Sequence, residues 1–178
     1  MKRILLLILL FSFSFCKKHE ESKVVLSEKT VDFFDPISLG ASGVKSNLKI
    51  RSHFSECGEW GGHQEDLEIF AKEGNYKDYF LNYTKTDIDC DNQDSKGRNI
   101  EKVTVQKTIK LTDLDKKSII SYMKRMIDSK VKERFPGHSG DEFWIINSDS
   151  TFVIKVYDRD SINLKSYDQL LSDLKLKQ

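Results

Sequence analysis

The stretch VTVQKTIKLTDLDKKSIISYMKRMIDSKV, residues 103–131, changes its hydrophobic period part-way along and so decides the fold class. Over residues 103–111 apolar and polar side chains alternate, which is typical of a half-buried strand. Lys107 interrupts the apolar side of that strand. Thr112 and Asp115 then have the spacing of a capping box, with aspartate in place of the usual glutamate. The pattern therefore predicts a strand followed at once by a helix.

The predicted helix covers about residues 113–134 and stops before Pro136 and Gly137. Its apolar residues recur at helical spacing and are expected to fill a core: Ile119, Met123, Met126, Ile127 and Val131.

Alternation and turn residues predict the remaining elements on both sides of this stretch. The expected strands are 48–54, 67–72, 76–83, 103–111, 143–147 and 151–157; a second helix is expected at 165–175 and a long polar loop at 86–99. Runs of strands interspersed with only two helices indicate an α+β fold. We expect a mostly antiparallel sheet of about six strands, with the two helices packed on one side.

The N-terminus has the features of an export signal. Met1-Lys2-Arg3 is basic, and residues 4–15 carry no charge before Cys16 and two lysines. This apolar run is shorter than the roughly 20 residues that span a bilayer. The segment Phe13-Ser14-Phe15-Cys16 resembles the relaxed lipobox of Bacteroidetes-type bacterial lipoproteins. An ordinary secretory signal and an uncleaved anchor are the alternatives.

The resemblance implies cleavage before Cys16, with fatty acyl chains such as palmitate on that residue. It gives a signal peptide at 1–15, a lipid-anchored tether at 16–30 and a single domain at 31–178. The implied location is the bacterial cell envelope, in the outer membrane at its periplasmic face or at the cell surface. The membrane is then one partner, through the lipid, and a protein partner is a second expectation.

Composition limits the other functions. The formal net charge of +1 is close to neutral and shows no clustered basic footprint for nucleic acid. No motif specifies a cofactor. The two remaining cysteines, Cys57 and Cys90, would face an oxidising compartment, so we expect a disulfide between them. Closing such a loop stabilises a fold by roughly 3–4 kcal/mol in the chain-entropy account.

Three short segments are candidate sites. Trp60 and His63 lie in a glycine-rich stretch and form a possible binding surface, although such a tryptophan also commonly folds back over a sheet edge. Asp87, Asp89 and Asp91 crowd one segment, where a solvated loop is the main expectation and calcium the lesser one.

His138 lies in a turn together with a serine and an aspartate, which do not by themselves make a catalytic triad. No catalytic constellation is evident elsewhere. We therefore expect a non-enzymatic binding or interaction domain at the membrane surface. The alternative is a small envelope hydrolase or metal-assisted enzyme that uses the His138 turn or the acidic segment 87–94.

Overall fold

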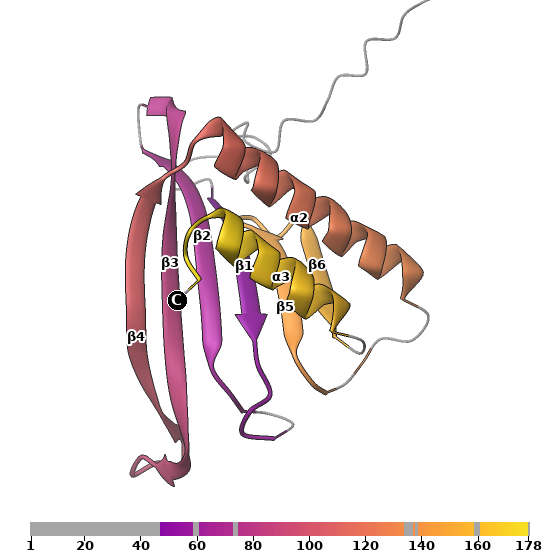
Figure 1. Ribbon diagram of the computed structural model, residues 1–178. Helices are drawn as coiled ribbons and strands as arrows, with labels where there is room; N and C mark the ends of the chain where they lie inside the picture. Colours follow the sequence, from indigo (N-terminus) through magenta and orange to yellow (C-terminus); the bar gives the residue numbers. More distant parts are fainter. Residues whose placement is uncertain are drawn as a thin grey trace, which may run out of the picture. The chain divides into compact units, whose positions relative to one another are not determined.

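The computed structural model describes residues 47–177, apart from 59–60, 73–74, 134–136, 138 and 159–160. These described residues form one six-stranded antiparallel sheet with strand order β4-β3-β2-β1-β5-β6, and two helices. Both helices cross the same face of the sheet (Figure 1). The elements are β1 Asn47–His53, β2 Gln64–Lys72, β3 Asn75–Gln93, β4 Asn99–Lys110, α2 Asp113–Lys132, β5 Glu142–Asn147, β6 Val153–Tyr157 and α3 Ile162–Asp173. The predicted α+β fold is confirmed.

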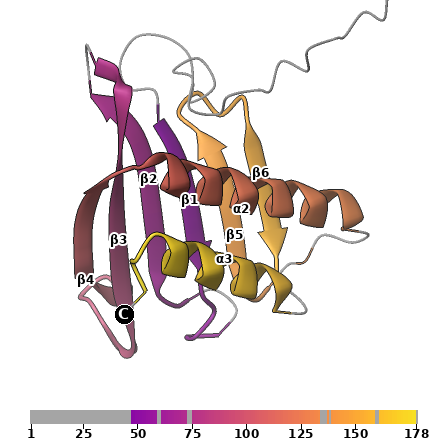
Figure 2. The same cartoon turned by 45° about the horizontal axis from the view of Figure 1, so that its top comes forward.

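The sheet is a four-stranded meander that is later extended on its other side. Strands β1 to β4 pair in sequence order, and β5 then adds next to β1. Helix α2 carries the chain across the sheet from β4 to the far edge, as Figure 2 shows. Strand β1 therefore lies inside the sheet, between β2 and β5.

The helix-covered face of the sheet forms the core. Leu48, Ile50 and Ser52 of β1 are almost wholly buried, as the alternation predicts. From α2, Met123 and Met126 are fully buried beneath the helix, which confirms their predicted role as core residues. The two helices also contact each other, and Tyr122 packs against Tyr167 with ring centroids 6.2 Å apart.

The structure confirms the prediction for the start of α2 and corrects it near the end of the helix. The capping box is confirmed, because the Thr112 hydroxyl accepts from the Asp115 amide and the Asp115 carboxylate accepts from the Thr112 amide. The prediction that Val131 faces the core is wrong, since 80% of its surface is exposed. The last turn of α2 extends beyond the edge strand β6 and has no sheet beneath it (Figures 1 and 2).

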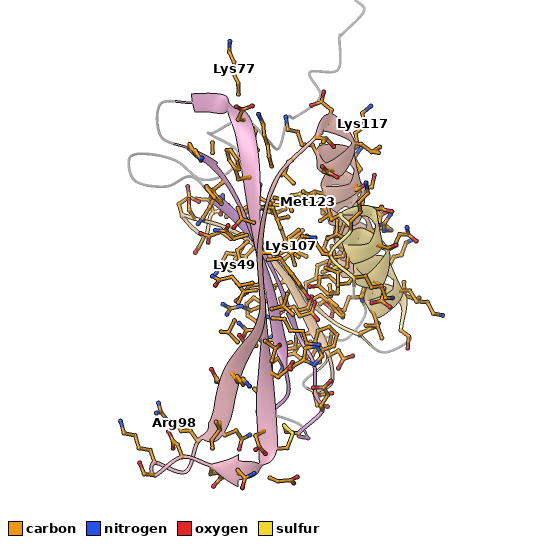
Figure 3. All side chains as sticks on the ribbon, turned by 60° about the vertical axis from the view of Figure 1, so that its left-hand side comes forward. Lys49, Lys77, Arg98, Lys107, Lys117 and Met123 are labelled. Atoms are coloured by element: carbon orange, nitrogen blue, oxygen red, sulfur yellow. A yellow bond between two sulfur atoms is a disulfide. The ribbon has the colours of Figure 1, made fainter. Side chains whose placement is uncertain are left out.

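The predicted long loop at 86–99 is wrong in most of its length. Strand β3 continues to Gln93 and pairs with β4 from Asn99 onward, so only a tight turn remains. We call residues 87–102 the arm, because pairing of β3 with β2 ends at Thr86 and the hairpin continues alone. In Figure 3 Arg98 marks its tip. A polar composition suggested a loop, but the backbone pairs here as a hairpin, although most of its residues are exposed.

The contacts of Lys107 explain why a lysine lies on the helix-covered face of the sheet. It lies opposite Tyr83, and its ammonium donates to the backbone carbonyl of Lys175, just after α3, at 3.1 Å. A cation near a helix C-terminus is favourable, because the helix carbonyls there carry partial negative charge. Within the described ranges, no helix is long and apolar enough to cross a membrane.

Candidate functional site

The sheet face opposite the helices is polar and carries a cleft. Along β1 the side chains of Lys49, Arg51 and His53 alternate with the buried ones, so they lie on this open face. Figure 3 shows Lys49 on one side of the sheet and Met123 of α2 on the other. The cleft has a volume of about 370 Å³, within the range of sites for small molecules. It is lined by Asn47, Lys49, Arg51, Glu68, Trp144, Ile146, Asn147, Ser148 and Ser150.

Trp144 on β5 forms a fixed wall of the cleft. Its indole N–H donates to the Glu142 carboxylate at 2.9 Å. The Lys155 ammonium binds the same carboxylate at 2.9 Å and lies 4.3 Å from the Trp144 ring centroid. Partial burial works against the charge on Lys155, but hydrogen bonds to Tyr157 and Glu142 outweigh it and raise the pKa of Lys155. The indole is therefore held in position before any ligand arrives.

The other charged groups of the cleft differ in the ion pairs and hydrogen bonds that they form. Arg51 pairs with Asp66 on β2, with Nε 2.8 Å from Oδ1, and Gln64 donates to the same carboxylate. Glu68 accepts a hydrogen bond from the side-chain amide of Asn47. Lys49 forms no ion pair with any residue that the structure describes, although its backbone lies directly opposite Glu68.

His63 belongs to a second polar site, at the end of the sheet where the β1–β2 loop returns. Its Nδ1 lies 2.7 Å from Glu56 and its Nε2 lies 3.3 Å from Glu65. The ring stacks on Phe54 at a centroid distance of 4.1 Å. Both ring nitrogens donate only in the imidazolium form, so the two carboxylates select the charged histidine. Burial works against this charge, but the carboxylates outweigh it and raise the pKa of His63.

Glu65 is the buried centre of this second site, with 6% of its surface exposed. It accepts from the Tyr167 hydroxyl of α3 at 2.8 Å, and the Lys85 ammonium lies 3.8 Å away. Burial alone would raise the pKa of Glu65, but hydrogen bonds from His63, Tyr167 and Tyr83 lower it below its ordinary value. A buried carboxylate with this many partners is a satisfied structural group.

The disulfide predicted between Cys57 and Cys90 is present, with the two Cα atoms 5.2 Å apart. It joins the β1–β2 loop to the arm. The glycines after it are required by close approach. A Cβ atom on Gly61 would lie 2.8 Å from the Cys57 Cβ, and one on Gly62 would lie 1.5 Å from the Phe54 carbonyl oxygen.

The acidic segment lies on the arm. Asp87 is close to Lys85, whereas Asp89 accepts from the backbone amides of Asp91 and Asn92 and so supports the chain locally. Among the residues that the structure describes, no three histidine, cysteine, aspartate or glutamate side chains are grouped to hold a metal ion.

Several predicted site residues lie outside the described residues: Cys16, Trp60 and His138. Of the predicted binding pair, only His63 is therefore placed, and it faces two carboxylates. Sequence reasoning missed the cleft. Lys49 and Arg51 in the middle of an alternating strand were its signal, but the adjacency of β1 and β5 could not be read from the chain.

Comparison with known proteins assigns no family to the chain. Scans against protein-family models and against curated proteins find no match to the chain.

Proposed function

We propose that this chain is an envelope lipoprotein whose α+β domain binds a ligand in the cleft of the open sheet face and catalyses no reaction. The observation that carries the binding role is the cleft of about 370 Å³, opposite the helix-covered core, with Trp144 already fixed in its wall. A preorganised wall favours binding because less conformational freedom is lost when the ligand is bound.

The arrangement of His63 supports binding over catalysis. A general base needs a ring nitrogen with a free lone pair that reaches the substrate. Both nitrogens of His63 face carboxylates instead. In the acidic segment, the carboxylate of Asp89 is occupied with backbone amides. These contacts give no support to a metal-assisted enzyme that uses the acidic segment, whereas His138 of the alternative hydrolase lies outside the described residues.

The lipid anchor rests on the sequence around Cys16. Stable attachment needs more than one acyl chain, and lipoprotein processing supplies them. The anchor is tested by expressing the full chain in a Gram-negative host with an alkyne analogue of palmitate. We expect the wild type to carry the label and to fractionate with membranes, and Cys16→Ser to lose both properties. An unacylated mature N-terminus in the wild type, found by mass spectrometry, would reject the anchor.

The cleft is tested by fluorine NMR. The chain has two tryptophans, so labelling with 5-fluorotryptophan gives two resonances, and Trp60→Phe assigns the one from Trp144. The full chain in a non-ionic detergent is titrated with a library of small polar and aromatic fragments. We expect a subset to shift the Trp144 resonance in a saturable way. If no fragment does so at millimolar concentration, the cleft is not a binding site.

A further inference from the structure

Lys49 occupies a position where a lysine has no evident structural role. It lies on β1, inside the sheet, and not on an edge strand where lysines prevent edge-to-edge pairing. Lysine is also among the residues that are depleted in strands. Its side chain is half-buried and points away from the helices (Figure 3).

Among the described residues that line the cleft, Lys49 is the cation that forms no ion pair. Arg51 is already neutralised by Asp66. Glu68 is directly opposite Lys49 on β2, but the two side chains form no ion pair within 4.0 Å, and Glu68 instead accepts from Asn47. A half-buried ammonium that forms no ion pair favours an incoming anion.

The apolar part of the cleft comes from β5, which pairs with β1 on the side away from β2. In the register of β1 with β5, Trp144 is opposite Arg51 and Ile146 is opposite Lys49. A cation and an apolar wall therefore lie on neighbouring strands, about one strand spacing or ~5 Å apart. This spacing suits a molecule that carries an anionic group next to a ring or a short aliphatic part.

We propose that the ligand of the cleft is a small organic anion, whose carboxylate or phosphate pairs with Lys49 and whose ring or aliphatic part packs on Trp144 and Ile146. This inference rests on the proposed binding function and names its ligand class. The anionic group binds the ammonium by charge-assisted hydrogen bonds, which are among the stronger polar contacts in proteins.

The test uses three probes that share a phenyl ring and differ in charge: benzoate, benzamide and benzylamine. Each is titrated into the 5-fluorotryptophan-labelled full chain in non-ionic detergent, and the dissociation constant is taken from the Trp144 resonance. We expect benzoate to bind tightest and benzylamine weakest. Added sodium chloride should weaken benzoate binding and leave benzamide binding unchanged, because salt screens the charge on Lys49.

Three variants assign the effect to Lys49. Lys49→Met keeps the apolar stem and should weaken benzoate binding about tenfold or more, as expected for loss of a hydrogen bond to a charged group. Glu68→Gln removes the opposing carboxylate and should strengthen benzoate binding. Lys117→Met, on the exposed side of α2, is the matched control and should change nothing.

The outcomes separate the two proposals. If benzamide or benzylamine shifts Trp144 as strongly as benzoate, or if Lys49→Met binds benzoate like the wild type, the anion inference is wrong while the cleft remains a binding site. If fragments in the wider library also leave the Trp144 resonance unmoved, the proposed function itself fails.

Discussion

His63 joins the β1–β2 loop to strand β2 through its charged ring. Its ring stacks on Phe54, and its two nitrogens face Glu56 from the loop and Glu65 from β2. The Cys57 sulfur in the same loop is bonded to the arm. One imidazolium therefore holds together a loop, a strand and, through the disulfide, the hairpin beyond them.

This charge gives a pH dependence of stability with a definite sign. The pKa of His63 is raised in the folded chain, because the two carboxylates outweigh the effect of burial. Its stabilisation is complete below the ordinary pKa of about 6.5 and is lost as the pH rises through the folded value. Glu56 and Glu65 have lowered pKa values, so their contribution is present above about 4.5 and is lost as the pH falls through their folded values.

We therefore predict that the free energy of unfolding falls between pH 6 and pH 9. In His63→Gln, which keeps a side chain that can donate a hydrogen bond but carries no charge, this fall should be smaller. The measurement is urea denaturation at a series of pH values. His53→Gln, on the open face of β1, is the matched control and should follow the wild type. An unchanged pH profile in His63→Gln would show that the imidazolium does not stabilise the fold.

Among the elements, the arm depends most on a covalent bond. Two-stranded hairpins are marginally stable by themselves in water, and the arm has no further strand beside it past Thr86. Cys90 lies within β3 in the arm, so the disulfide with Cys57 fastens this hairpin to the β1–β2 loop. Its stability is thus expected to come from the disulfide and the backbone pairing more than from packing.

We predict that Cys57→Ala/Cys90→Ala lowers the free energy of unfolding by roughly 2–4 kcal/mol, as for typical disulfides. Amide hydrogen exchange should speed up most in the arm and in the loop, and least in β1. The wild-type disulfide is checked by intact mass, which should rise by about two daltons on reduction. Equal acceleration throughout the sheet would show that the bond stabilises the whole domain rather than the arm.

At the scale of the whole molecule, the two faces of the sheet have different roles. One face packs under α2 and α3 and forms the core, and the other carries the cleft. Met123 and Lys49 represent the two sides (Figure 3). A ligand that binds to the open face does not have to displace α2 or α3.

This separation predicts that stability and binding respond to different substitutions. Met123→Ala should cost about 2–5 kcal/mol of unfolding free energy, the range for large-to-small changes at buried sites. Lys49→Met should change stability by less than about 0.5 kcal/mol, because it removes no ion pair or core contact. Thermal and urea denaturation measure both. A large loss of stability in Lys49→Met would mean that its charge serves the fold.

The sequence predicted those strands and helices in which burial of one side makes apolar residues recur at a regular spacing. The alternation in β1 and the helical spacing in α2 follow from one apolar side, and the capping box follows from local hydrogen bonding. The arm left no such period, because both of its faces meet water. The exposure of Val131 depends on where the sheet ends beneath α2, which the helix pattern does not contain.

The candidate site was harder to predict because its residues come from separate strands. The cysteine pair could be inferred because only two cysteines remain after Cys16. Lys49 and Trp144 become neighbours only through the pairing of β1 with β5, which lies far along the chain. The buried link between Glu65 and Tyr167 likewise joins residues whose sequence separation is 102.

The central position of β1 also has a consequence for the order of folding. Strands β1 to β4 precede β5 in the chain, and this meander can pair before β5 joins it. Until β5 and the two helices arrive, one edge of β1 and the apolar side of the meander stay open. Non-local pairing of this kind is slow. A folding intermediate that β5 has not yet joined would therefore have an unpaired edge on β1, and a holdase chaperone would protect it best from aggregation at this stage.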